Sequence, residues 1–229
     1  MIIVTTPMCE KILEFAGISE YKVNKNPGNE KADLAILLSE SKIKMNSLSI
    51  KLNTFSQIKD SIIEVSKLGD NGDIGNISKN PISDEKINDI FAQYSIASDW
   101  ISDKKKALQE KNSKIKVKVY SKFLRDIVED MGFSIIDFDD DKFSDFYYIV
   151  FPDYMNIDEV VNFKNNNVDE INNFNNSTNS HSNPNHSNNY SISNNCEIIS
   201  IPTHKNVPKD PIKRAEMRYS ILNDLKINI

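Results

Sequence analysis

One short pattern near the start of the chain restricts the fold more than any other feature. Apolar residues at 2–4 predict a strand, and the spacing of apolar residues over 9–16 predicts an amphipathic helix that ends at Gly17. Further strands are expected at 21–23 and at 32–38, and the second of these is a nearly continuous apolar run. Such a run is typical of a strand that is buried on both faces of a parallel sheet. The pattern therefore indicates an α/β fold.

Much of this pattern returns in the second half of the chain. A constant offset of 115 residues aligns the first strand and helix with residues 117–132, and a slip of three residues then aligns the strand that follows. The aligned pairs are Ile2 and Val117, Val4 and Val119, Ile12 and Ile127, Leu13 and Val128, Glu14 and Glu129, Gly17 and Gly132, Asp33 and Asp145, and Leu37–Leu38 and Ile149–Val150. Few of these pairs are identical, so a chance match of two strand–helix–strand units is the alternative to a structural duplication.

The remaining pattern completes two lobes. Residues 1–80 are expected to form an N-terminal α/β lobe, residues 81–112 a connecting helix, and residues 113–229 a C-terminal α/β lobe. The expected fold class is α/β, with two small lobes that contain mainly parallel three-layer sheets and are joined by a long helix. The other expected elements are strands at 48–52, 115–119, 134–138, 145–151 and 197–201, and helices after Asn53 or Thr54, after Ser83 or Asp84, at 122–131 and at 212–225.

Residues 162–195 have a composition unlike the rest of the chain. Nearly half of them are Asn, and few are apolar. A segment of this kind buries too little apolar surface to offset the entropy lost on ordering. We therefore predict a disordered insertion within the second lobe.

Composition and charge exclude several classes of protein. The net charge of −5 argues against a generic nucleic-acid binder. No apolar run reaches the length of a membrane-spanning helix, and no secretory signal precedes the first strand. The two cysteines, Cys9 and Cys196, do not make a disulfide framework. We expect a cytoplasmic protein that binds neither nucleic acid nor membranes.

The densest group of polar residues lies in the loop and helix that follow the last strand. Three prolines stiffen this loop, and a helix N-terminus with nearby cations attracts phosphate or carboxylate groups. The group consists of Thr203, His204, Lys205, Lys209, Lys213, Arg214 and Arg218. It indicates a contact with an anionic ligand or partner, and the alternative is a solvated basic helix on an acidic protein.

A second candidate region connects the first strand to the first helix. Thr5, Thr6 and Cys9 lie there, at the carboxyl edge of the predicted sheet, where ligands bind in open α/β folds. Hydroxyl groups and helix amides at this edge can hold an anion, and a helix start lowers the pKa of a cysteine. The alternative is that a threonine caps the helix and Cys9 packs as a small apolar residue. No glycine-rich phosphate-binding motif is present.

Other polar and aromatic groups give weaker signals. The spacing of the cysteines and the three histidines excludes a structural zinc site, although a single axial ligand to a cofactor's metal stays open. The acidic run at 137–141 is interpreted as a solvated loop, with a cation site as the alternative. Tyr147, Tyr148, Phe151 and Tyr154 are interpreted as strand residues, with the wall of an aromatic pocket as the alternative.

Four segments carry a resemblance to a known superfamily. They read Val-Thr-Thr-Pro at 4–7, Ile-Leu-Glu-Phe-Ala-Gly at 12–17, Tyr-Lys-Val at 21–23 and Ala-Asp-Leu-Ala-Ile-Leu-Leu at 32–38. With the strand and helix over 50–69 and the helix near 84–111, this order resembles the helical-backbone metal-binding proteins. These include class III periplasmic binding proteins for haem, siderophores and cobalamin, and nitrogenase components. The chain lacks the signal peptide of the former and the cysteine ligands of the latter.

The C-terminal phrase carries a second resemblance. Ile-Pro-Thr-His-Lys-Asn-Val-Pro-Lys-Asp-Pro-Ile-Lys-Arg-Ala-Glu, at 201–216, is similar to small archaeal proteins that are restricted to methanogens, of the methanogenesis-marker type. This resemblance implies a role around methyl-coenzyme M reductase or its nickel tetrapyrrole, and a protein partner in a methanogenesis-related complex.

Together these observations favour a non-enzymatic binding or assembly-accessory protein with a cleft between the lobes for an anionic ligand. The sequence does not name a cofactor. The expected site residues are Thr5, Thr6 and Cys9 from the first lobe, Tyr120, Ser121, Asp153, Thr203, His204 and Lys205 from the second, and Arg214 and Arg218 for ligand carboxylates or an acidic partner. The alternatives are an enzyme that acts on a small anionic substrate through Cys9 or His204, and a structural subunit of a larger complex.

Overall fold

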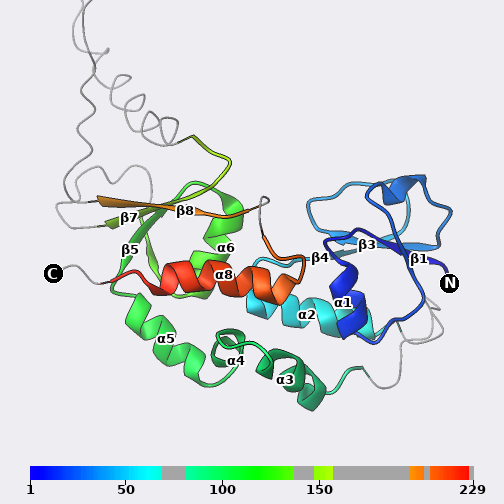
Figure 1. The fold of residues 1–229 in the computed structure, drawn as a ribbon, viewed down its shortest axis with the longest axis horizontal. Helices are drawn as coiled ribbons and strands as arrows, with labels where there is room; N and C mark the ends of the chain where they lie inside the picture. Colours follow the sequence, from blue (N-terminus) through cyan, green and yellow to red (C-terminus); the bar gives the residue numbers. More distant parts are fainter. Residues whose placement is uncertain (69–80, 137–146, 157–195, 204–206, 227–229) are drawn as a thin grey trace, which may run out of the picture.

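The structure is a computed structural model of the whole chain. It describes residues 1–68, 81–136, 147–156, 196–203 and 207–226 (Figure 1). Three sequence predictions lie outside these ranges: the disordered insertion at 162–195, the acidic run at 137–141, and the positions of His204 and Lys205.

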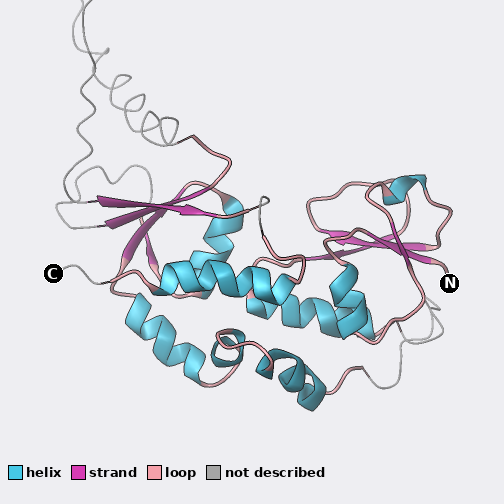
Figure 2. Ribbon diagram, in the orientation of Figure 1, coloured by secondary structure: helices cyan, strands magenta, loops and turns pink. Residues whose placement is uncertain are grey.

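Two four-stranded parallel sheets form the framework of the molecule (Figure 2). Their strand orders are β2-β1-β3-β4 and β6-β5-β7-β8, so the second sheet repeats the topology of the first. The strands are β1 (Ile3–Thr5), β2 (Lys22–Val23), β3 (Leu34–Leu38), β4 (Ser47–Ile50), β5 (Lys116–Val119), β6 (Ser134–Ile135), β7 (Tyr147–Pro152) and β8 (Cys196–Ile201). The prediction of an α/β fold with two lobes is confirmed.

The pairing of the strands shows that the two halves share one register. In β1 and β2 the partners Val4 and Lys22 lie 18 residues apart, as do Lys116 and Ser134 in β5 and β6. Partners in β1 and β3 lie 31 residues apart, and so do partners in β5 and β7. The constant offset of 115 residues therefore continues through the third strand, and the expected slip of three residues is wrong. The register follows from the backbone pairing of the strands. The slip was inferred from apolar residues, and because both strands are apolar along their length, several alignments match equally well.

The α-helices lie on one side of both sheets, whereas the short η1 (Pro27–Asn29) lies on the other side of the first sheet (Figures 1 and 2). A single apolar core joins the α-helices to residues from both sheets, such as Ile36 and Val150. The opposite face of the first sheet carries Val4, Ala35 and Leu37, which pack against loop residues. In the described part of the chain each lobe therefore has one layer of strands and one layer of α-helices, where a second helical layer was expected on the other face of the sheet. The helices are α1 (Glu10–Phe15), η1 (Pro27–Asn29), α2 (Phe55–Ser66), α3 (Asp84–Ala92), α4 (Ala97–Trp100), α5 (Lys104–Asn112), α6 (Lys122–Asp130) and α8 (Pro211–Asn223).

The connection between the lobes differs from the single long helix expected over 84–111, because α3, α4 and α5 replace it. Tertiary hydrogen bonds compete with the helical ones at the first break: the backbone N–H of Ile96 donates to Oε1 of Glu216 at 2.7 Å. At the second break, Ser102 donates to the carbonyl of Asp99 at 2.9 Å. Short polar side chains of this kind favour turns over helix interiors.

Two of the sequence-predicted helix caps are present. Thr54 accepts a hydrogen bond from the backbone of Gln57 at the start of α2, and Ser83 accepts one from Lys86 at the start of α3. Such caps satisfy amide groups that have no partner within the helix. None of the helices in the described ranges is long and apolar enough to cross a membrane.

Candidate functional site

A cavity of about 280 Å³ lies between the two lobes. It is formed by the carboxyl ends of β3, β4, β7 and β8, by the loop after β1, and by α6 and α8. This is the edge at which open α/β sheets bind their ligands. The lining residues are Met8, Leu38, Glu40, Leu52, Asn53, Phe123, Tyr154, Thr203, Arg214 and Arg218. The cavity lies where the sequence predicts the inter-lobe cleft.

Helix α8 brings two arginines to this cavity. Asp210 caps the helix, since its Oδ1 accepts hydrogen bonds from the backbone of Ile212 at 2.8 Å and of Lys213 at 3.1 Å. Pro211 occupies the first turn, where a missing N–H costs nothing. Arg214 and Arg218 follow four residues apart, so both side chains project from the same face of the helix. Both line the cavity.

Arg214 is buried in contact with neutral groups. Only 2% of the surface of Arg214 is exposed to solvent. Its Nη1 donates to the carbonyl of Pro208 at 3.3 Å and to Sδ of Met8 at 3.5 Å, and a thioether is a weak acceptor. These two contacts use a single nitrogen of a guanidinium that carries five N–H donors.

Arg218 is held more firmly and is 4% exposed. Its Nε donates to the carbonyl of Pro202 at 3.1 Å, and its Nη2 donates to the carbonyl of Thr203 at 3.2 Å. Its guanidinium carbon also lies 4.5 Å from the centroid of the Phe123 ring, which gives a cation–π contact. These contacts fix the orientation of the guanidinium without neutralising it.

Neither arginine forms an ion pair within the described residues. Burial, together with the smaller effect of the Arg214 charge, lowers the pKa of Arg218 to about 9, although the carboxylate of Asp153 acts in the opposite direction. Burial also lowers the pKa of Arg214. A buried cation without a carboxylate partner is unfavourable, and two in one cavity wall add mutual repulsion. The site is therefore electrostatically prepared for an anion.

A comparison of α8 with α2 shows that the two arginines occupy helix positions that are apolar in the first half of the chain. The fourth and eighth residues of α2 are Ile58 and Ile62, which are fully buried in the apolar core. The fourth and eighth residues of α8 are Arg214 and Arg218. The two helices follow equivalent strands and lie side by side (Figure 1). The second half thus carries two buried charges at positions where the first half carries apolar side chains.

The other walls are mostly apolar. Met8, Leu38, Leu52 and Phe123 supply hydrophobic surface. Tyr154 lies at the opening and is 65% exposed. Small-molecule sites typically combine such apolar walls with a few placed polar groups.

Three of the sequence-predicted site residues from the first lobe lie outside the cavity lining. Thr5 is buried, and its hydroxyl donates to the carbonyl of Ile36 at 2.9 Å. The hydroxyl of Thr6 donates to Sγ of Cys9 at 3.5 Å. Cys9 is fully buried, and burial raises the pKa of its thiol even though the Thr6 hydrogen bond and the charge of Arg214 act to lower it. A thiol in this state is a poor nucleophile.

Of the site residues predicted in the second lobe, some line the cavity and others hold neighbouring residues in place. Thr203 lines the cavity with the two arginines. Asp153 supports Thr203, because its Oδ1 accepts hydrogen bonds from the Thr203 hydroxyl and from its backbone N–H. Ser121 caps α6 by accepting from the backbone of Leu124, and Tyr120 packs on the cluster at the other face of the second sheet. The structure does not describe His204 and Lys205.

Sequence reasoning missed several wall residues. Met8, Glu40 and Asn53 each come shortly after a strand of the first sheet, and Phe123 lies in the first turn of α6, the helix after β5. Their positions at carboxyl ends of parallel strands are the signal that could have identified them. The place of Tyr154 in the lining agrees with the alternative interpretation of this residue as part of a pocket wall.

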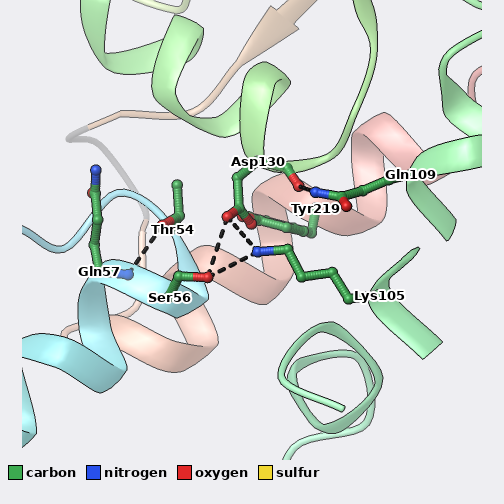
Figure 3. A network of polar contacts seen from close by, with 7 residues as sticks. All are labelled: Thr54, Ser56, Gln57, Lys105, Gln109, Asp130 and Tyr219. Atoms are coloured by element: carbon green, nitrogen blue, oxygen red, sulfur yellow. Dashed lines mark hydrogen bonds and ion pairs between the residues drawn. The ribbon is translucent and has the colours of Figure 1, made fainter. Parts of the chain in front are cut away.

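A polar network fastens the two lobes beside the cavity (Figure 3). Asp130 accepts hydrogen bonds from the hydroxyl of Tyr219 at 2.6 Å, from Nζ of Lys105 at 2.7 Å and from the hydroxyl of Ser56 at 3.2 Å. One helical turn earlier, Oδ2 of Asp126 accepts from Nδ2 of Asn53 at 3.0 Å. Two carboxylates of α6 in the second lobe thereby hold the start of α2 in the first.

Neither a metal site nor a relative supplies a function. No group of three or more metal-ligating side chains occurs in the ranges that the structure describes. No protein-family model, no curated protein and no solved structure matches this chain. The function has to be argued from the chemistry of the inter-lobe cavity.

Proposed function

We propose that this protein binds a small anionic molecule between its two lobes. Arg214 and Arg218 hold the anionic group, and the apolar walls of the cavity enclose the body of the ligand. The observation that carries the proposal is the burial of both guanidiniums in one cavity wall with no carboxylate partner in the described residues. A bound carboxylate or phosphate would supply the missing charge through forked hydrogen bonds.

The volume of the cavity limits the ligand. About 280 Å³ is just below the usual range of roughly 300–1,000 Å³ for small-molecule sites. A metal tetrapyrrole is larger than this cavity, so we favour a compact anion over the tetrapyrrole that the methanogen resemblance implies. An accessory role beside methyl-coenzyme M reductase remains a proposal that rests on that resemblance alone.

Binding without catalysis is the form of the proposal that the site supports best. Cys9 is fully buried and burial raises its pKa, which weakens the alternative of an enzyme with a cysteine nucleophile. Both cysteines are free thiols. This is consistent with the reducing cytoplasm, which we propose as the compartment.

The proposal is tested by thermal unfolding in the presence of matched small molecules. Hexanoate and phenylphosphonate combine an anionic group with an apolar body, and hexanamide has the shape of hexanoate without its charge. We expect the two anions to raise the midpoint of unfolding and hexanamide to leave it unchanged. A ligand at 100 times its dissociation constant stabilises a fold by about 2.7 kcal/mol.

Substitutions assign the effect to the cavity. Arg214→Met and Arg218→Met should remove the stabilisation by both anions. Arg125→Gln is the matched control, because Arg125 pairs with Glu129 at 3.8 Å and does not line the cavity. If the wild-type protein shows no stabilisation specific to anions, or if either methionine variant retains it, the proposed function is wrong.

A further inference from the structure

The charged groups of the cavity are divided between the lobes. Both arginines belong to α8 of the second lobe. The first lobe contributes one charged residue to the wall, Glu40, which follows the end of β3. No lysine of the described residues lines the cavity. A ligand between the lobes therefore meets positive charge on one side and negative charge on the other.

Glu40 has unused capacity as an acceptor. Its Oε1 accepts one hydrogen bond, from the hydroxyl of Ser39 at 3.0 Å. No basic side chain of the described residues lies within ion-pairing distance of it. A carboxylate accepts several hydrogen bonds, so Glu40 can still receive N–H donors from a ligand. An ammonium group of a ligand would interact with the negative charge of Glu40 and also donate hydrogen bonds to its carboxylate oxygens.

Apolar side chains complete the wall, from the first lobe Met8, Leu38 and Leu52, and from the second lobe Phe123. They favour a hydrocarbon body over a polar one. A single amino acid or a short ω-amino acid fits a cavity of about 280 Å³.

We propose that the ligand is bipolar: a compact molecule with an anionic group at Arg214 and Arg218, a short hydrocarbon body, and an amine at Glu40. This inference rests on the proposed function, because it assigns the second end of the same ligand. It narrows the ligand class from small anions to amino acids and related amino-carboxylates.

The test compares molecules that differ only by the amine. Hexanoate is paired with 6-aminohexanoate, and 4-methylpentanoate with leucine, so that both a distant and a neighbouring amine are sampled. Isothermal titration gives the dissociation constant of each with the full chain. We expect the amine to tighten binding about three- to fivefold in at least one pair, the range that a partly exposed ion pair supports.

The variant Glu40→Gln identifies the group responsible. It should remove the advantage of the amine and leave the binding of hexanoate and 4-methylpentanoate within about twofold of wild type. Glu20→Gln is the control, because Glu20 is exposed, lies outside the cavity and changes the net charge equally. That variant should keep the advantage.

The outcomes separate the two proposals. If the carboxylates bind through the arginines but the amine adds nothing in either pair, or if Glu40→Gln retains the advantage, the bipolar ligand is wrong and the proposed function stands. If none of the four molecules binds, both proposals fail. A tightening of about three- to fivefold that disappears in Glu40→Gln and persists in Glu20→Gln supports the bipolar ligand.

Discussion

Gly17 and Gly132 hold the same backbone position in the two halves of the chain, with φ angles of +82° and +79°. Each ends a helix in the same way, because the N–H of Gly17 donates to the carbonyl of Glu14 and that of Gly132 to the carbonyl of Glu129. The following N–H groups, of Ile18 and Phe133, reach one residue further back. This is the Schellman arrangement, in which a left-handed residue at the end of a helix is usually glycine.

The two glycines differ in their surroundings, which gives a matched pair of variants. A Cβ atom at Gly17 would meet nothing within 4 Å, whereas one at Gly132 would lie 2.6 Å from Cβ and 2.7 Å from Cα of Gln109. We expect Gly17→Ala to lower the free energy of unfolding by about 1–2 kcal/mol, through the left-handed backbone alone. Gly132→Ala should cost about 1–3 kcal/mol more because of overpacking. Equal losses in urea denaturation would contradict the close approach of α5.

The bond between Asp130 and Tyr219 leads to a prediction about how the lobes are joined. Asp130 gathers donors from three helices, and Tyr219 lies between the rings of Phe55 and Trp100, with centroids at 4.4 Å and 5.2 Å. Asp130→Asn should lower the free energy of unfolding by about 1–3 kcal/mol, since Lys105 loses its partly buried ionic partner. Tyr219→Phe keeps the ring packing and should cost about 1–2 kcal/mol.

A double-mutant cycle tests whether these two groups act together. If the Asp130–Tyr219 hydrogen bond is the shared interaction, the combined variant should lose less than the sum of the single losses. Strict additivity would show that the two side chains stabilise the fold independently.

Local patterns were sufficient to predict the elements but not how they are arranged in space. The apolar run of β3 and the caps at Thr54 and Ser83 are signals within a few residues, and the structure agrees with them. The break at Ile96 depends on Glu216, which is 120 residues away in the sequence. Helix propensity and apolar periodicity are local properties and cannot predict a hydrogen bond between such distant residues. A single helix was therefore the simplest interpretation of 84–111.

The candidate site was predictable to the extent that it follows from strand ends. Thr203, Arg214 and Arg218 were singled out by a basic segment after a core strand, and they lie together in the cavity wall. Their burial was not evident, because a basic helix is more often solvated. It becomes visible only when α8 is compared with α2, whose equivalent positions are Ile58 and Ile62. That comparison counts residues from the start of each helix, which the structure places at Phe55 and Pro211.

Arg214 should be more important for binding than for stability. Its hydrogen bonds end on Pro208 and on the sulfur of Met8, and its charge is buried next to that of Arg218. Arg214→Met replaces this cation by an apolar side chain of similar length. We expect the free energy of unfolding without ligand to stay within about 1 kcal/mol of wild type or to rise, because an unfavourable buried charge is removed. A loss of more than about 2 kcal/mol in urea denaturation would contradict this.

The two cysteines should react at very different rates. Cys9 is fully buried and burial raises the pKa of its thiol, whereas Cys196 is partly exposed. Iodoacetamide at pH 8 should therefore modify Cys196 first, with Cys9 on the order of 100-fold slower because it reacts only after local opening. Mass spectrometry of timed samples measures both rates, and unfolding in guanidinium should make them similar. Rapid alkylation of Cys9 in the native protein would contradict its burial.

The affinity for anions should fall at high pH in a way that depends on Arg218. Its pKa in the folded protein is lowered from the ordinary value of an arginine to about 9, so between these two values the unfolded chain binds more protons than the folded one. The burial of this cation consequently destabilises the fold below pH 9, and the penalty decreases as the pH rises above 9 toward the ordinary pKa of an arginine. An anion binds the protonated guanidinium, so binding above pH 9 also requires the uptake of a proton.

We therefore expect the dissociation constant of hexanoate to be constant between pH 7 and about 8.5, and to rise by up to about tenfold per pH unit above 9. Arg125→Gln, whose substitution lies outside the cavity, should show the same pH dependence as the wild-type protein. If the affinity of the wild-type protein stayed constant up to pH 10.5, Arg218 would keep its proton there. The neutral contacts with Pro202, Thr203 and Phe123 would then be enough to hold a buried cation in its charged form.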